Sequence, residues 1–460
     1  MWTDRPGVVP LLLRRMLLPL AFAAQAQAAG MAQVQTWTLD NGARVMFVES
    51  RALPILDVAV EFRAGSAFDP AERAGLAAMT QHLSRFGAGG LGEEDIARRL
   101  GEVGAQLSGR IDVDRAGFTL RTLATRPERT QALDMFARVV QQPDFPLPAL
   151  ERERTRIVTN LREEATRPAI VASRQFFAAA YGSHPYALRP LGDADGVRAL
   201  TRDTIVDFRR RFYTGVSAVV SIVGDVSRAE AGEIARQVAG ALPAGSVRPV
   251  PPAVPSLPAA QVRRVPHPSL QSHILLGMPA VSLSDPDYFA LLVGNHVLGG
   301  GGFASRLTVE VRERRGFAYS VFSSLQPWLE RGPFQVSLQT RRDQTDEALA
   351  VARSVLFEFL AKGPTEAELA SARRNLVNGF PLRIDTNREL LDLVATIGFH
   401  DLPADWLAQW PKRVERVGRE DVLRAFQRLD PQRLVTVVVG AADEPPPAPP
   451  LPHQQQPRLR

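Results

Sequence analysis

The sequence predicts an α+β protein built from two homologous halves. Strand-like and helix-like patterns alternate in the same order along both parts of the chain. His82 is matched by His296, 214 positions later, and Gly224 is matched by Gly440, 216 positions later. A proline-rich stretch, residues 242–266, separates the two series and has the composition of an extended linker. A near-constant offset between distant landmarks indicates an internal duplication.

The first half opens with a predicted β-hairpin. Apolar and polar residues alternate on both sides of Asp40-Asn41-Gly42, and an Asn-Gly pair favours the tight turn that joins two strands. Strand and helix patterns then follow one another. The predicted strands cover residues 56–65, 117–124 and 219–225, and the predicted helices cover residues 72–86, 93–103, 128–142, 149–165 and 200–212.

The second half repeats this order after the proline-rich stretch. Its predicted strands cover residues 273–281, 332–340 and 434–441, and its predicted helices cover residues 287–299, 345–363 and 417–429. The long helix over 345–363 ends at Gly363-Pro364, because these two residues stop a helix. Thr365 follows, with Glu368 three residues later, and this spacing predicts a capping box at the start of another helix.

Length and composition are those of an ordinary globular protein with several domains. The chain has 460 residues, of which 45% are hydrophobic and 23% are charged, and its net charge is +6. The arginines are scattered among acidic residues instead of forming a basic stripe, so we expect no nucleic-acid partner. The sequence has no cysteine, which excludes disulfides, zinc held by cysteine and catalysis by a thiol.

The N-terminus has the pattern of a secretory signal peptide over residues 1–29. Arg14 and Arg15 precede a short apolar run, and residues 26–28 (Ala-Gln-Ala) fit the A-x-A form of a cleavage site. The alternatives are a buried helix or a start codon placed too early. This run and every other apolar segment are too short to span a membrane. We therefore expect no stable membrane insertion and, in a bacterium, a periplasmic protein.

These features divide the chain into five segments. After the signal peptide we expect an N-terminal domain over residues 34–241, the linker over residues 242–266, a C-terminal domain over residues 267–441 and a disordered tail over residues 442–460. The tail is rich in proline and glutamine and holds too little apolar surface to fold.

Three segments of the chain resemble the pitrilysin/insulinase family of zinc peptidases, also called inverzincins, which includes the mitochondrial processing peptidases. They are RAGSAFDPAERAGLAAMTQHL (residues 63–83), YGSHPYALRPLGD (residues 181–193) and LGGGGFASRLTVEVRERRGFAYSV (residues 298–321). The resemblance covers about residues 34–441. It implies that each half is built on a mixed α/β sheet.

The residues that would bind zinc in such a protein are largely replaced. The family uses an H-x-x-E-H helix and a glutamate from a second helix. Here Ala78 stands at the first histidine, Gln81 at the general base and Asn160 at the third ligand, so that only His82 is kept. One histidine cannot hold catalytic zinc, and an amide cannot take a proton from water. We therefore expect no metal in this chain, and His82 to be a polar, partly buried residue.

Arg312 and Tyr319 lie seven positions apart in the second half, within RERRGFAYS. The family has an arginine and a tyrosine at this spacing, which reach a catalytic site formed by the other half or by another subunit. The resemblance implies that they hold the substrate backbone and stabilise the developing oxyanion, for which both are suitable donors. The alternative is a solvated run of charge beside a core tyrosine, and this is how we interpret Arg314 and Arg315.

Four consecutive glycines follow His296 closely. They are Gly299, Gly300, Gly301 and Gly302. No Gly-Lys-Ser/Thr sequence comes after them, so they do not form a phosphate-binding loop. We expect a flexible loop that lies near a substrate peptide.

Two functions are consistent with these patterns. The first is the non-metal-binding partner subunit of a periplasmic two-chain zinc metallopeptidase that degrades peptides. Its partner would be a homologous chain that carries H-x-x-E-H and the zinc. The second is a catalytically inactive scaffold or peptide-binding protein of the same fold. A peptidase that is active alone would need metal ligands that the sequence lacks.

Overall fold

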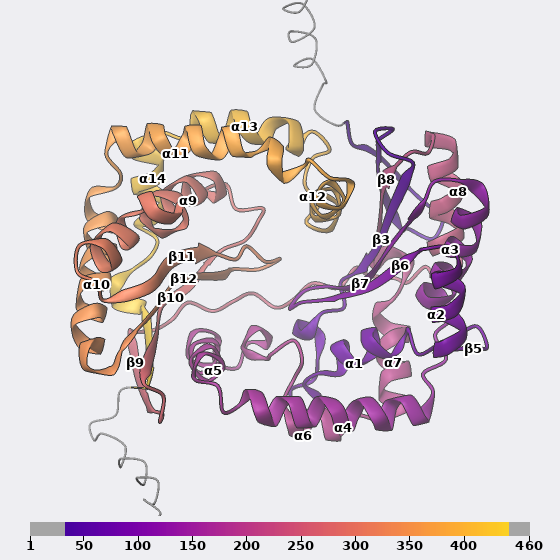
Figure 1. Cartoon of the computed structure of the whole chain (residues 1–460), viewed down its shortest axis with the longest axis horizontal. Coiled ribbons are helices and arrows are strands. Elements are labelled where there is room, and N and C mark those ends of the chain that lie inside the picture. Colours follow the sequence, from indigo (N-terminus) through magenta and orange to yellow (C-terminus); the bar gives the residue numbers. More distant parts are fainter. Residues whose placement is uncertain (1–32, 441–460) are drawn as a thin grey trace, which may run out of the picture.

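The computed structural model describes residues 33–440, which fold into two sheet-and-helix halves (Figure 1). The N-terminal half is drawn in indigo to magenta and the C-terminal half mainly in orange to yellow. The predicted signal peptide, residues 1–29, and the predicted tail, residues 442–460, lie outside the described residues. Within residues 33–440, no helix combines the length and apolar composition needed to cross a membrane.

The N-terminal half contains a six-stranded mixed sheet in the order β1-β2-β8-β3-β7-β6. Its strands are β1 (Gln35–Thr38), β2 (Arg44–Glu49), β3 (Ile55–Phe62), β6 (Gln106–Ile111), β7 (Ala116–Leu123) and β8 (Ala218–Gly224). β2 and β8 are parallel, and the other neighbours are antiparallel. The predicted hairpin is confirmed as β1 and β2, and Gly42 closes its turn with a φ of 89° that glycine adopts without strain.

The C-terminal half contains a five-stranded mixed sheet in the order β11-β12-β10-β13-β9. Its strands are β9 (Gln261–Pro266), β10 (Gln271–Val281), β11 (Ala318–Leu325), β12 (Gly332–Arg341) and β13 (Val435–Gly440). Here β9 and β13 are the parallel pair, as β2 and β8 are in the first sheet. With β1 set aside, the two sheets share one order and one pattern of strand directions. The predicted α+β fold of two homologous mixed-sheet halves is confirmed.

The duplication extends to single glycines. Gly224 ends β8 with a φ of 155°, and a Cβ atom there would lie 2.4 Å from the carbonyl oxygen of Ile55. Gly440 ends β13 with a φ of 123°, and a Cβ atom there would lie 2.5 Å from the carbonyl oxygen of Gln271. Both glycines are required because the neighbouring backbone leaves no room for a side chain.

The predicted linker over residues 242–266 is too long. Residues 261–266 form β9, which pairs in parallel with β13 at the edge of the second sheet. The composition of the segment suggests an extended chain, but residues 261–266 find backbone partners, so that they belong to the C-terminal sheet. The stretch between the last helix of the first half and β9 is free of helices and strands.

Helices surround both sheets. The first half has α1 (Leu76–Leu83), α2 (Glu93–Glu102), α3 (Arg126–Gln141), α4 (Leu147–Glu164), α5 (Pro168–Tyr181), α6 (Ala194–Arg198), α7 (Arg202–Phe212) and α8 (Arg228–Ala239), and a small β4 (Gly87–Ala88) and β5 (Leu91–Gly92) pair. The second half has α9 (Tyr288–Asn295), α10 (Thr345–Lys362), α11 (Glu366–Gly379), α12 (Asn387–Phe399), α13 (Trp406–Arg416) and α14 (Arg419–Phe426). The predicted capping box is confirmed, because Thr365 and Glu368 each accept the other's backbone N–H at the start of α11.

The helix predicted over residues 72–86 is shorter in the structure. α1 begins at Leu76, because Gly75 has a φ of 98° and breaks the helical path before it. The buried carboxylate of Asp69 accepts the backbone N–H groups of Gly75 and Ala77, each at 2.7 Å, and caps the helix from a distance in the sequence. The helix ends at Leu83.

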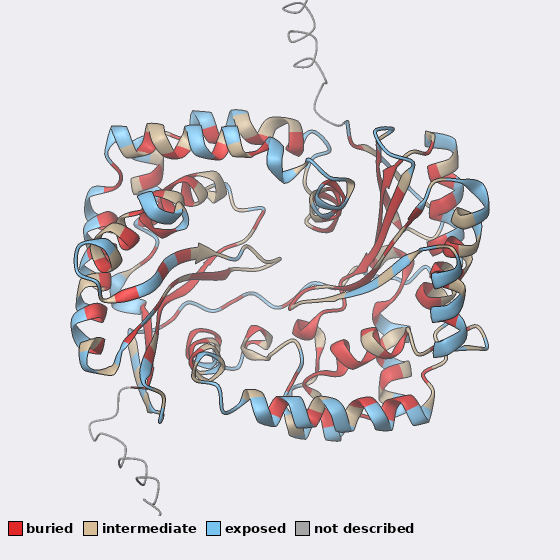
Figure 2. Cartoon of the chain, in the orientation of Figure 1, coloured by how far each residue is buried: buried red, intermediate tan, exposed pale blue. Residues whose placement is uncertain are grey.

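The two halves exchange helices. α5 of the N-terminal half packs on β10 and β13 of the second sheet, whereas α12 of the C-terminal half packs on β2, β3 and β8 of the first sheet. Phe176 of α5 is completely buried in the core of the second sheet. A Cβ atom at Gly398 of α12 would lie 2.6 Å from the Val219 side chain, which shows how closely α12 approaches the first sheet. In Figure 2 the central strands of both sheets are largely buried, while the edge strands and the outer helices carry many exposed residues.

Candidate functional site

The four positions that correspond to the zinc site line one cavity of about 270 Å³. α1 contributes Ala78, Gln81 and His82, and α4 contributes Asn160. α1 and α4 thus bring together residues that are about 80 positions apart in the sequence, as the resemblance implies. The cavity therefore gathers the four residues that the resemblance assigns to a zinc site.

His82 is held by charged neighbours from α4 and from the residues just after α1. Its Nε2 donates a hydrogen bond to the buried carboxylate of Glu153 at 2.8 Å, and its Nδ1 accepts one from Arg85 at 3.1 Å. The guanidinium of Arg156 lies 3.2 Å from Nε2 and also binds Glu153. Burial lowers the pKa of His82 below its ordinary value, so the ring is neutral at pH 7.

Glu153 anchors this network. Burial alone would raise the pKa of Glu153, but hydrogen bonds from His82 and Arg156 lower it, and the net pKa lies below its ordinary value. Glu153 therefore stays ionised at neutral pH and fixes the orientation of the His82 ring. Glu153 is a residue that the sequence analysis did not single out, because its spacing matches no ligand position of the family.

Gln81 is a structural residue at the position of the general base. Its Nε2 donates a hydrogen bond to the carbonyl oxygen of Gly117 in β7 at 3.1 Å. Its amide also lies over Gly109 in β6, where a Cβ atom would come within 2.0 Å of Nε2. The side chain thus joins α1 to the edge of the first sheet.

The residues present do not fit a zinc ion. Ala78 has no donor atom, and the amides of Gln81 and Asn160 are poor zinc ligands. Both ring nitrogens of His82 are already engaged, and the guanidinium groups beside them would repel a cation. Among residues 33–440, no group of three histidine, cysteine, aspartate or glutamate side chains is placed to hold a metal ion.

Arg312, which is half-buried, forms a cluster with the exposed rings of Tyr319 and Phe303. The guanidinium of Arg312 lies 5.0 Å from the ring centroid of Phe303 and 4.9 Å from that of Tyr319. These are cation–π contacts, which hold the arginine between two rings. Tyr319 is 86% exposed and Phe303 is 70% exposed. The alternative of a core tyrosine is therefore wrong.

Two π-helical turns shape this cluster. Arg312 lies in the π-helix Thr308–Glu313, and α9 continues directly into a second π-helix, His296–Gly300. π-helices are rare and are frequent at functional sites. Tyr319 lies on β11, the edge strand of the second sheet. The cluster thus combines two irregular helices with a strand that has one open edge among the described residues.

The glycines Gly299, Gly300, Gly301 and Gly302, predicted as a flexible loop, lie in helical turns and at the junction between them. Gly299 and Gly300 belong to the π-helix, and Gly302, with a φ of 65°, opens a short 3₁₀ turn. Gly301 joins the two turns with a φ of −87° and a ψ of 17°.

Close packing explains why glycines stand here. A Cβ atom at Gly299 would lie 2.4 Å from the backbone nitrogen of Ser323 in β11, and one at Gly301 would lie 2.5 Å from the carbonyl oxygen of His296. The glycines let this segment pack against β11 and present Phe303 beside Arg312. Phe303 was missed in the sequence, although a large apolar residue directly after four glycines is a usable signal.

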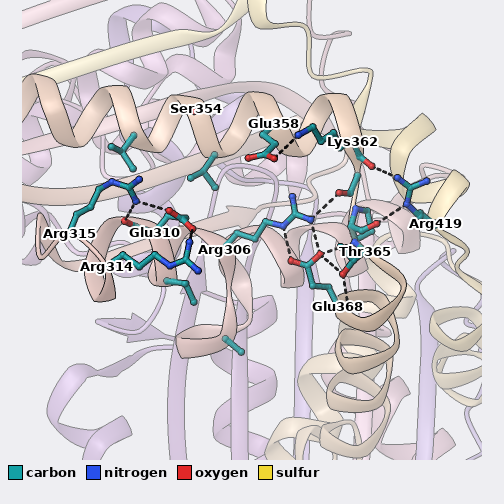
Figure 3. A pocket seen from close by; sticks show the side chains of 16 residues that line it. Arg306, Glu310, Arg314, Arg315, Ser354, Glu358, Lys362, Thr365, Glu368 and Arg419 are labelled. Carbon is teal, nitrogen blue, oxygen red and sulfur yellow. Dashed lines mark hydrogen bonds and ion pairs between the residues drawn. The ribbon is translucent and has the colours of Figure 1, made fainter.

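Arg314 and Arg315 behave as a solvated charge run. Both pair with Glu310, at 2.5 and 2.6 Å (Figure 3). Arg314 and Arg315 line a second cavity, of about 740 Å³. In the same cavity Arg306 forms a bidentate ion pair with Glu368. These guanidinium groups are already paired, unlike that of Arg312, which contacts aromatic rings. The two predicted sites are separate within the chain, because neither Arg312 nor Tyr319 lines the cavity beside α1.

Comparisons with known proteins agree with this geometry. Two family models match the chain: "Insulinase (Peptidase family M16)" over residues 44–193 and "Peptidase M16 inactive domain" over residues 199–376. An uncharacterized zinc protease of Mycobacterium leprae is 29% identical over 368 residues, which cover 79% of this chain and 81% of the relative. A non-peptidase homolog of Helicobacter pylori is 22% identical over 381 residues, which cover 82% of this chain and 87% of the relative.

A solved structure gives the same result. The crystal structure of a peptidase M16 inactive domain from Pseudomonas fluorescens is 34% identical and matches with a TM-score of 0.85. The match covers 89% of this chain and 98% of that one. The resemblance stated from the sequence is therefore confirmed. The chain belongs to the pitrilysin/insulinase (M16) family of peptidases.

Proposed function

We propose that this chain is the non-metal-binding subunit of a periplasmic two-chain zinc peptidase that degrades peptides. One observation supports the proposal above others. The guanidinium of Arg312 contacts the exposed rings of Phe303 and Tyr319, while Ala78, Gln81 and Asn160 stand at positions that the resemblance assigns to the zinc site. Neutral decay of a former enzyme would be expected to erode both sites.

In this proposal the chemistry is divided between two chains. A homologous chain with an intact H-x-x-E-H helix holds the zinc, which activates the attacking water. Arg312 and Tyr319 of this chain donate hydrogen bonds to the substrate backbone and to the oxyanion of the tetrahedral intermediate. The high exposure of Tyr319 suits a group that acts on a substrate in a partner's site. The predicted signal peptide supports a periplasmic location.

The test is to purify this chain alone, and together with an H-x-x-E-H chain encoded beside it. We expect no stoichiometric zinc and no peptide cleavage by this chain alone, and both in the pair. Tyr319→Phe in the pair should lower kcat with the assembly intact, because the phenol is lost and the ring remains. Stoichiometric zinc and full activity in this chain alone would overturn the proposal.

A second function is an inactive scaffold or peptide-binding protein of the same fold. The observation that favours it is the cavity beside α1, which persists although its residues cannot hold a metal ion. This function predicts that no H-x-x-E-H chain copurifies with the protein. It also predicts that substitutions of Arg312 and Tyr319 leave the role of the protein in the cell unaltered.

A further inference from the structure

Three arginines converge where the two halves meet. They come from β2, from the residue after β3 and from the linker, and all three bind the carboxylate of Asp401. They are Arg44, Arg63 at 2.7 Å and Arg248 at 2.5 Å. Asp401 follows α12, which packs on the first sheet (Figure 1), and its φ of 58° is uncommon for a residue other than glycine. One carboxylate thus joins the N-terminal half, the linker and the C-terminal half.

The charges of this arginine cluster are not balanced. Asp401 supplies one negative charge against three guanidinium groups. The last two carbonyl oxygens of α12 also accept hydrogen bonds from the arginines, and a helix C-terminus adds only a partial negative charge. Burial and the nearby Arg248 and Arg44 lower the pKa of Arg63 to about 10, so Arg63 still carries its charge at pH 7. More than one positive charge is therefore left over.

The neighbouring titratable groups do not remove this surplus. The guanidinium of Arg115 is paired with Asp112 at 2.7 Å and with Glu61 at 3.3 Å, so these two carboxylates are already engaged. Burial lowers the pKa of His400, the residue before Asp401, to about 3, and its ring is neutral at pH 7. The surplus positive charge thus stays beside Asp401.

The arginine cluster is also short of hydrogen-bond acceptors. A guanidinium has five N–H donors, and Arg44 and Arg248 each use two of them within the described residues. The Nε–H groups of Arg63 and Arg248 are buried and have no acceptor among those residues, which is destabilising. The side chains of Arg44 and Arg248 are 31% and 20% exposed, so a small solute can reach their remaining donors.

We propose that the arginine cluster at Asp401 is a binding site for a small free oxyanion such as phosphate or sulfate. An oxyanion supplies both negative charge and several acceptor oxygens, and the planar guanidinium fork matches its geometry. It binds on the exposed side of Asp401, to Arg44 and Arg248. By reducing the repulsion among the arginines, the bound anion stabilises the contact of α12 with the first sheet. The site involves neither zinc nor peptide cleavage, so it goes beyond the two-chain peptidase.

The proposal is tested with the full chain alone and inorganic phosphate. Isothermal titration calorimetry is done in a chloride buffer of fixed ionic strength, so that screening of charges stays constant. We expect one phosphate to bind per chain, sulfate to compete with it, and the melting temperature to rise and saturate with the same Kd. A general salt effect on stability would not saturate in this way. If phosphate shows no saturable binding, the proposal is wrong.

A substitution of the linker arginine locates the site. We expect Arg248→Gln to weaken phosphate binding at least about tenfold, because a charged donor is lost. Arg138→Gln is the matched control, since Arg138 of α3 is also partly exposed and binds one carboxylate, that of Asp134, and one carbonyl oxygen, that of Gly89. It should leave phosphate binding unchanged. Undiminished binding in Arg248→Gln, or an equal loss in Arg138→Gln, would contradict the assignment.

A third variant separates anion binding from stability and covers the case in which Arg248→Gln does not fold. Asp401→Asn removes the carboxylate that the arginines share, so the protein should be less stable without phosphate. The same change increases the surplus positive charge, and we expect phosphate to bind at least about threefold more tightly. Phosphate binding that weakens or stays the same in Asp401→Asn would show that the arginines serve the protein contact alone. The two-chain proposal can fail independently of all these results.

Discussion

At the scale of single residues, Gln81 has a structural role at a position that the resemblance assigns to the general base. A carboxylate there could take a proton from water, whereas the Gln81 amide donates to the carbonyl oxygen of Gly117. The amide is 4% exposed and lies over Gly109, which has no side chain to compete for the space. The Gln81 side chain therefore stabilises the contact between α1 and the sheet edge.

Restoring the glutamate should damage the fold without restoring chemistry. Gln81→Glu removes the donor to Gly117 and places a carboxylate against a carbonyl oxygen in a buried site. We expect a loss of about 1–3 kcal/mol in the free energy of unfolding, measured with urea. Glu94→Gln, on the exposed surface of α2, is the control and should be neutral. A Gln81→Glu protein as stable as the wild type would show that the Gly117 contact contributes little.

At the scale of elements, Asp69 defines where α1 begins. Burial raises the pKa of Asp69 to about 7, although the N–H groups of Ala77 and Gly75 act in the opposite direction. The folded chain thus binds this proton more tightly than the unfolded chain does. The contribution of Asp69 to stability is highest below about pH 4 and falls as the pH rises toward 7.

The direction in which the Asp69 contribution to stability changes with pH gives a direct prediction. Asp69→Asn removes the titration, so between pH 4.5 and 7.5 its melting temperature should fall less, or rise more, than that of the wild type. Groups with lowered pKa values, such as Glu230 and Glu368, are present in both proteins and cancel in the difference. Differential scanning calorimetry at both pH values provides the comparison. Parallel pH profiles would mean that Asp69 titrates normally.

Local patterns explain which elements could be predicted from the sequence. The hairpin at Gly42 and the capping box at Thr365 could be predicted, because each depends on residues that are close together in the sequence. The duplication could be predicted because matching residues recur at a near-constant offset. The start of α1 could not be predicted, because Asp69 caps it from outside the helix. The strand β9 could not be predicted within the proline-rich stretch, because it forms only through its pairing with β13. The contact of Arg312 with the Phe303 ring joins a π-helix to a 3₁₀ turn, and no sequence period reveals either element.

At the scale of the whole molecule, the exchanged helices join the two halves. α5 is buried against the second sheet and α12 against the first (Figure 1). Beyond α12, Asp401 binds Arg44, Arg63 and Arg248 of the N-terminal half and the linker. The continuity of the chain through residues 242–260 is therefore not what holds the halves together.

Cutting the linker should leave the molecule assembled. A protease site inserted between the exposed Ser246 and Val247 would divide the chain between the halves after folding. We expect the two fragments to co-elute in gel filtration and to separate only in denaturant, because each carries a helix buried in the other. Separation under native conditions would show that the exchanged helices are not sufficient.

The central claim is that Arg312 acts on a substrate held by a partner's zinc site. The most direct measurement is the kcat of peptide cleavage by the purified pair with Arg312→Ala, beside Arg315→Ala as the neighbouring exposed control. We predict a fall in kcat of about 10²–10³-fold for Arg312→Ala, as for loss of an oxyanion donor, with zinc content and assembly unchanged. Arg315→Ala should remain near the wild type, because that guanidinium is paired with Glu310. A pair that keeps its full kcat without the Arg312 guanidinium would contradict the claim.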